Sequence, residues 1–352
     1  MIATKVTIGL ATPTGMSAPY AYLALALALG YDREEGLQLG FCYGGEPGAT
    51  ARALGSGACD IACLNTIVGF MGSANEGLAM LAIGSKARRA HRYFAVLAES
   101  PVAALAQLRG KRIACDFPHI QPLAEAALAE EGVPAGEFAW LAWQGSGMGI
   151  GEMIDPLRRG EVDALFLMDW TDGDAMARGL RLRHLPSRLL GRINVSSCYW
   201  TTQAAFASQG QVLARALRAI QKSIVFSFEN PRAALRMMWQ TQPYTRPAPD
   251  ARDAVLAHDI EVLKACLEPM HIDPDDPDPR WCAISGRDMQ AWQTFLLSAG
   301  TIRQRLDLDR LYTTALVEAA NAAGHPHAMM NNLVSVQHRG RQIEVETSSL
   351  SC

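Results

Sequence analysis

Short apolar runs alternate with segments of helical periodicity over the first half of the chain. Four apolar runs come first, near residues 5–10, 38–42, 60–64 and 80–84. Four more follow, near residues 94–98, 112–115, 138–142 and 164–168. Strands that alternate with helices in this way are typical of parallel βαβ units. The pattern therefore predicts an α/β protein with two mostly parallel sheets, each flanked by helices.

The second half of the chain, residues 208–323, has a helical pattern instead. Apolar side chains recur there at helical spacing, as in Val212, Leu213, Ala216, Leu217 and Ile220. Because proline interrupts a helix, Pro231 and Pro243 should divide this stretch into separate helices.

Two crossings between the sheets, near residues 84–93 and 193–201, would give two lobes. Lobe one would then hold residues 1–86 and 202–323, and lobe two would hold residues 87–201. A chain of 352 residues is beyond the size at which one core usually splits into domains, which agrees with this division. Residues 324–352 are polar and carry no motif, so we expect a surface tail.

Three spaced motifs carry family information. The first is the segment 30–37, Gly-Tyr-Asp-Arg-Glu-Glu-Gly-Leu, followed by a Gly-Gly turn at 44–45 and by Leu-Gly-Ser-Gly at 54–57. The others are Leu-Arg-Gly-Lys-Arg-Ile-Ala at 108–114 and Leu-Arg-Arg-Gly-Glu-Val-Asp-Ala at 157–164. Together they resemble the bacterial solute-binding proteins of the nitrate, sulfonate, taurine and thiamine-precursor type.

This resemblance implies a two-lobed, type II periplasmic-binding-protein-like fold that closes on a small molecule. It also implies delivery of that molecule to an ABC importer, with an ABC permease as partner. Because one fold hosts several functions, the resemblance is more specific for the fold than for the ligand. A cytosolic enzyme or ligand sensor on the same scaffold therefore stays open, similar to the thiamine-pyrimidine synthase, a sulfinate desulfinase or a decarboxylase.

Two of these enzyme types have motifs that the chain lacks. The synthase would require a His on the helix after the third strand, where residues 65–74 hold neither His nor Lys. The desulfinase would require a Cys after the first strand, where the chain has Thr12-Pro13-Thr14. A remaining catalytic hypothesis uses His119 as a general base oriented by Asp169 or Asp116. Of the two hypotheses, we favour binding over catalysis.

Charge and motif content narrow the partners further. The formal net charge is only -3 and the basic residues are scattered, so we expect no nucleic-acid binding. The apolar run 21–29 is too short to span a bilayer and fits an interior helix ending at Gly30, so we expect no membrane insertion. The chain shows neither metal-ligand spacing of its histidines nor a phosphate-loop or dinucleotide motif, so we expect no metal and no cofactor.

Eight cysteines bear on the compartment. Their spacing does not resemble a disulfide framework, and most lie in apolar segments where Cys acts as a small hydrophobe. The run 21–29 is not a convincing export signal either. We therefore expect free thiols, with a periplasmic location if a leader has been removed and a cytoplasmic one otherwise.

The ligand should lie at one edge of the sheets, because open parallel sheets bind ligands beyond the carboxyl ends of their strands. From lobe one, this rule selects Thr12, Thr14, Tyr43, Gly44, Gly45, Asn65, Thr66 and Ser85. From lobe two and the return crossing, it selects Asp116, Phe117, Asp169, Trp170, Tyr199 and Trp200.

The chemistry of this set favours a small ring-bearing ligand but leaves its charge open. The aromatic side chains would supply flat contact area. Helix N-termini at the strand ends, with Lys86, Arg88 and Arg89 beside the first crossing, would suit a carboxylate or a sulfonate. Asp116 and Asp169 would suit an amine or an aminopyrimidine-like edge instead.

Overall fold

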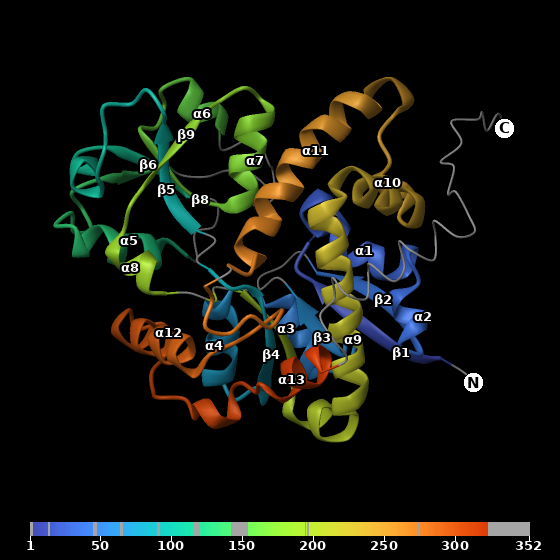
Figure 1. The fold of residues 1–352 in the computed structure, drawn as a ribbon. Coiled ribbons are helices and arrows are strands. Elements are labelled where there is room, and N and C mark those ends of the chain that lie inside the picture. Colours follow the sequence, from blue (N-terminus) through green and yellow to red (C-terminus); the bar gives the residue numbers. More distant parts are fainter. Residues whose placement is uncertain are drawn as a thin grey trace.

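Two five-stranded sheets organise the protein (Figure 1). The computed structural model describes residues 3–12, 15–44, 48–63, 66–89, 92–115, 120–141, 154–193, 195, 197–273 and 275–322. Helices flank both sheets, so the predicted α/β architecture with two lobes is confirmed. We call the elements around the first sheet lobe one and those around the second sheet lobe two; the boundaries between them stay a prediction.

The first sheet has the strand order β2-β1-β3-β10-β4. Its strands are β1 (Thr4–Leu10), β2 (Leu37–Tyr43), β3 (Ile61–Cys63), β4 (Met80–Ala87) and β10 (Ser197–Thr202). β1 pairs in parallel with β2 and β3, whereas β10 is antiparallel to β3 and β4. The carboxyl ends of β1 to β4 therefore meet at one edge of the sheet.

The second sheet has the strand order β7-β6-β8-β5-β9. Its strands are β5 (Arg92–Leu97), β6 (Arg112–Cys115), β7 (Ala139–Trp140), β8 (Ala164–Met168) and β9 (Leu182–Leu185). β6 is parallel to β7 and β8, whereas β5 is antiparallel to β8 and β9. β9 was not predicted, because an edge strand carrying Arg183 and His184 lacks a buried apolar run.

The chain leaves the first sheet at Ala87 and enters the second at Arg92. It returns to the first sheet as β10, whose insertion between β3 and β4 places the return crossing beside the outgoing one. Both lobes thus face one another across the crossings.

The helices of the first half include one that is almost wholly buried. They are α1 (Ala21–Ala28), α2 (Tyr31–Glu34), α3 (Ala49–Gly55), α4 (Ile67–Asn75), α5 (Gln121–Glu130), α6 (Ile154–Arg158), α7 (Asp169–Ala177) and α8 (Arg188–Arg192). The first six residues of α1 are buried, and the chain then turns at Gly30, whose φ is 75°. The apolar run 21–29 is therefore a core helix, as predicted.

The second half is helical, as predicted. Its helices are α9 (Gln203–Glu229), α10 (Pro231–Thr241), α11 (Arg252–Leu267), α12 (Gly286–Ser298) and α13 (Ala315–Asn321). Pro231 begins α10, and Pro243 follows its end. In the part of the chain that the structure describes, no helix is long and apolar enough to cross a membrane.

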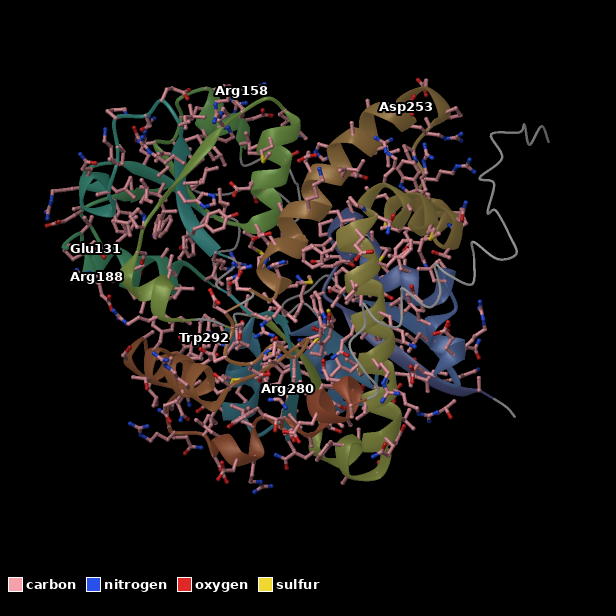
Figure 2. All side chains as sticks on the ribbon, viewed as in Figure 1. Glu131, Arg158, Arg188, Asp253, Arg280 and Trp292 are labelled. Carbon is pink, nitrogen blue, oxygen red and sulfur yellow. The ribbon has the colours of Figure 1, made fainter. Side chains whose placement is uncertain are left out.

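Helix α11 joins the two lobes. It packs on α10 and on the short turn Ala18–Tyr20 in lobe one, and along α7 in lobe two (Figure 1). Gly173 permits this approach, because a Cβ atom there would lie 2.4 Å from the carbonyl oxygen of Glu261. Side chains elsewhere stay within one lobe, as for Arg188 and Glu131, whose Nε and Oε1 atoms are 3.0 Å apart (Figure 2).

Candidate ligand-binding site

The strand ends of the two sheets bring together a buried group of charged and aromatic side chains. Lys86 comes from the end of β4, Arg92 from the start of β5 and Asp169 from the residue after β8. These three side chains belong to residues that are at most 4% exposed. Tyr20 and Cys266 complete the group, which we call the interlobe cluster.

Lys86 has few partners for a buried ammonium group. Its Nζ atom lies 3.9 Å from the Cys266 sulfur and 5.6 Å from the centroid of the Tyr20 ring. No carboxylate among the described residues forms an ion pair with it. The Cys266 thiol itself donates to the carbonyl oxygen of Pro19 at 3.2 Å. A charged group buried in this way is stable only with a suitable partner, so Lys86 is set to receive one.

Asp169 does not supply that partner fully. Burial raises the pKa of its carboxyl group to about 7, although Lys86 acts to lower it. Its Oδ1 atom accepts a hydrogen bond from the backbone N–H of Trp170 at 3.0 Å. Near neutral pH the carboxyl group is therefore only partly ionised, and Lys86 and Arg92 leave the cluster with an excess of positive charge.

The predicted aromatic residues have different surroundings. Trp170 lies edge-on to Tyr20, with centroids 6.3 Å apart, and so belongs to the interlobe cluster. Trp200 is fully buried and stacks on Phe70 at 4.4 Å. Tyr199 is also fully buried, and its hydroxyl donates to that of Tyr22 at 3.4 Å. Within this structure Tyr199 and Trp200 pack in the core of lobe one, because β10 is an interior strand.

The predicted polar residues of lobe one shape the strand ends. The Thr12 hydroxyl donates to the carbonyl oxygen of Gly15 at 2.7 Å and closes the turn after β1. The backbone N–H of Gly44 donates to the Leu10 carbonyl oxygen at 2.9 Å. Thr66 caps α4, and its hydroxyl accepts from the backbone N–H of Gly69 at 3.4 Å. Ser85 is fully buried.

Several predicted residues lie outside the described part of the chain. They are Thr14, Gly45, Asn65, Asp116, Phe117 and His119. Ligand contact by any member of the predicted set therefore stays a prediction, as does the catalytic hypothesis for His119 with Asp169.

Tyr43 meets a residue that the sequence did not suggest. The Tyr244 hydroxyl donates to that of Tyr43 at 3.1 Å and accepts from the backbone N–H of Met16 at 2.8 Å. Gly15, at φ 89°, makes room for it, since a Cβ there would lie 2.7 Å from the Tyr244 oxygen. Tyr244 thus ties the segment after α10 to the turn after β1.

Tyr20, Arg92, Cys266 and Tyr244 were missed for one reason. Each lies at the start of a strand or in a helix or connection, whereas the rule we applied examines strand ends. Lys86 carried a sequence signal, because it stands beside Ser85 at the first crossing.

The interface between α7 and α11 contains a buried ion pair next to this cluster. The Nε2 atom of His258 on α11 lies 2.6 Å from Oδ1 of Asp174, which is fully buried on α7. Asp259 is 2.9 Å from the other ring nitrogen. Hydrogen bonding to Asp174 and Asp259 raises the pKa of His258 to about 9. The pair links the lobes through a charged contact.

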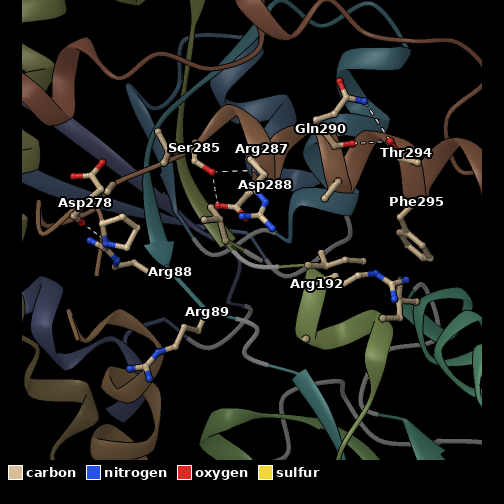
Figure 3. A pocket seen from close by; sticks show the side chains of 18 of the residues that line it. Arg88, Arg89, Arg192, Asp278, Ser285, Arg287, Asp288, Gln290, Thr294 and Phe295 are labelled. Atoms are coloured by element: carbon tan, nitrogen blue, oxygen red, sulfur yellow. Dashed lines mark hydrogen bonds between the residues drawn. The ribbon is translucent and has the colours of Figure 1, made fainter. Parts of the chain in front are cut away.

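A groove with a volume of about 1240 Å³ lies between the lobes beside the crossings (Figure 3). Helix α12 lines one side of it, and α5 and α8 line the other. Its charged groups already have partners, as for Arg88 with Asp276 at 2.7 Å and Arg192 with Glu130 at 2.6 Å. Since Lys86 and Asp169 do not line this groove, we place the ligand at the strand ends.

The family comparison covers most of the chain. A family model described as NMT1/THI5 like matches residues 18–234. No curated protein matches the chain significantly.

Solved structures share the fold. The periplasmic aliphatic sulphonate binding protein SsuA from Escherichia coli aligns with a TM-score of 0.62 and 16% identity, covering 87% of this chain and 91% of that one. The periplasmic nitrate-binding protein NrtA from Synechocystis PCC 6803 gives 0.60 and 13%, covering 91% and 89%.

An enzyme shares the fold as well. The desulfurization enzyme DSZB, solved in complex with biphenyl-2-sulfinic acid, gives a TM-score of 0.55 and 16% identity, covering 92% of this chain and 100% of that one. At these identities the alignments show the fold alone, which is that of the two-lobed periplasmic binding proteins, as predicted.

Proposed function

The chain belongs to the NMT1/THI5-like family, and from that premise we propose that it binds a small anion with a ring-bearing body between its lobes for an ABC importer. The names of two structural neighbours describe periplasmic binding proteins for sulphonate and nitrate, which are anions. Delivery to a permease and a periplasmic location form part of the proposal.

The observation that carries the proposal is the charge of the interlobe cluster. Lys86 is buried without a carboxylate partner among the residues described, and Arg92 lies in the same buried group. An anionic ligand would supply the missing counter-charge, and its interaction with Lys86 would be strong because little water is present there. Asp169 can become protonated and so need not repel the anion, since its pKa is about 7.

The ring-bearing body rests on Tyr20 and Trp170. Their edge-on contact holds two flat side chains next to Lys86. A ring placed against them would gain contact area at small cost in side-chain entropy. The aromatic anchors we propose are thus Tyr20 and Trp170, with Tyr199 and Trp200 behind them.

Thiol-based catalysis is less well supported by the cluster. Burial raises the pKa of both Cys63 and Cys266 to about 12, which opposes formation of the thiolate that a nucleophile requires. Binding therefore fits these two cysteines better than covalent chemistry does.

Calorimetry with a matched ligand set tests the proposal. The set contains an alkyl sulfonate, an aromatic sulfonate, the corresponding neutral sulfonamide and an aromatic amine of similar size. We expect binding of the sulfonates, tighter for the aromatic one, and none of the amine. Preferential binding of the amine would overturn the charge assignment, and equal affinity for the two sulfonates would overturn the aromatic part.

A further inference from the structure

Two cysteines that are distant in the sequence meet above a glycine. Cys42 on β2 is paired in register with Gly9 on β1. Cys59 reaches the same place from the turn before β3. A Cβ atom added to Gly9 would lie 2.9 Å from the Cys59 sulfur and 3.6 Å from the Cys42 sulfur. Because Gly9 has no side chain, both sulfurs occupy the space above the middle strand.

The thiols of Cys42 and Cys59 hydrogen-bond to one another. Two other described cysteines contact different groups: the Cys266 thiol faces the Pro19 carbonyl and Lys86, and the Cys63 sulfur lies 3.8 Å from the Tyr22 hydroxyl. Cys42 is partly exposed, whereas Cys59 is buried. One member of the pair can therefore be reached from solvent and the other is held in place beside it.

We propose that Cys42 and Cys59 are a modification site that forms a disulfide with an external disulfide as oxidant. The Cys42 thiolate attacks the external disulfide, which gives a mixed disulfide on Cys42 and releases one thiolate. The Cys59 thiolate then attacks the Cys42 sulfur and releases the second thiolate. Two protein thiols are oxidised by two electrons, the external disulfide is reduced to two thiols, and both protein protons pass to the leaving thiolates.

The bond would join β2 to the entry of β3 across β1. It would close the loop that contains α3 and so restrict the unfolded chain. Because Tyr43 follows Cys42 directly, the bond would also fix the end of β2 beside the candidate site. Its formation does not depend on the ligand, so the inference stands apart from the proposed function.

Oxidation by glutathione disulfide tests the proposal. The folded, reduced protein is incubated with it at pH 8.5, because burial raises the pKa of both thiols and slows the reaction at neutral pH. The remaining thiols are then alkylated under denaturing conditions, and the peptides are mapped by mass spectrometry. We expect a Cys42–Cys59 disulfide and a rise in Tm of roughly 5 °C on oxidation.

Three variants separate the steps. Cys59→Ala should stop at a glutathione adduct on Cys42, and Cys42→Ala should react about tenfold more slowly or less, because the remaining thiol is buried. Cys198→Ala, at a fully buried cysteine on β10, is the control and should still form the disulfide. A bond between other cysteines, or free Cys42 and Cys59 in wild-type protein that has kept its native circular dichroism, would overturn the proposal.

Discussion

Two buried lysines, Lys86 and Lys222, have the same burial but different partners. Lys86 is 3% exposed and Lys222 is 6% exposed, and each ammonium group lies near a tyrosine ring, at 5.6 and 5.8 Å. Lys222 on α9 contacts Glu34 at 3.0 Å and Glu35 at 2.9 Å. Lys86 has only the Cys266 sulfur at 3.9 Å. Lys222 is thus fully paired within lobe one, whereas the partner of Lys86 must come from outside the protein.

The difference follows from the place of each lysine in the fold. Lys222 joins α9 to α2, two helices of one lobe, and Arg218 adds a further contact to Glu35 at 2.9 Å. Lys86 stands where two sheets meet, and a complete set of partners there would leave no interaction for a ligand. An incompletely paired buried charge therefore marks a binding site better than a buried charge alone.

Lys222→Met should have the largest effect on stability. Removal of this lysine leaves Glu35 buried with Arg218 as its remaining partner, and loss of one member of a buried pair costs about 3 kcal/mol. Lys86→Met should leave the free energy of unfolding unchanged or increase it, because it removes an incompletely paired charge. Urea denaturation of both variants measures this, and equal destabilisation would refute the contrast.

Gly173→Ala should disturb the contact that positions the second lobe. Its Cβ would meet backbone atoms of Glu261 and Val262 at 2.4 to 2.6 Å, so α7 and α11 must move apart at a cost of about 2 kcal/mol. Since Asp169 begins α7, ligand affinity should fall as well. Gly191→Ala, where a Cβ would meet nothing within 4 Å, is the matched control. Unchanged stability and affinity in Gly173→Ala would show that the interface is looser than described.

Asp169 should make anion binding depend on pH. Its folded-state pKa of about 7 lies above the ordinary 3.8, so its contribution to stability is present below pH 3.8 and lost as the pH rises through about 7. Over the upper part of this range the ionised carboxylate begins to repel an anion. We expect affinity for a sulfonate to fall about tenfold between pH 6 and pH 8. Calorimetry of Asp169→Asn should show a flat profile, and an unchanged slope would assign the effect to another group.

His258 should have the smallest effect, on stability rather than on affinity. Its pKa is raised from 6.5 to about 9, so its stabilising contribution is complete below pH 6.5 and lost as the pH rises through about 9. Because the ring is partly exposed, we expect a loss of about 1 kcal/mol between pH 6 and pH 9.5. His258→Gln should remove this dependence in urea titrations, whereas His271→Gln, at an exposed ring, should not.

The sequence predicted the architecture well because the strands of β1, β3, β4 and β8 are continuous apolar runs. The core helix α1 and the crossings at 84–93 and 193–201 also follow from local pattern. Edge strands were harder, as β9 shows, because half of their residues face solvent.

The candidate site was only partly predictable. Asp169 and Trp170 could be named because they directly follow an apolar strand. Tyr20 and Cys266 could not, since they come from a turn and a helix that reach the cluster through tertiary packing. Whether a lysine such as Lys86 or Lys222 lacks a partner depends on residues far away in the chain, and no local pattern records it.

The central claim is that Lys86 receives the charge of the ligand. The most direct test measures, by calorimetry, the affinity of one aromatic sulfonate for the wild-type protein, for Lys86→Met and for the surface variant Lys264→Met. We expect Lys86→Met to lose about 2 to 4 kcal/mol of binding free energy while keeping its stability, and Lys264→Met to bind as the wild type does. Wild-type affinity in a folded Lys86→Met protein would contradict the account.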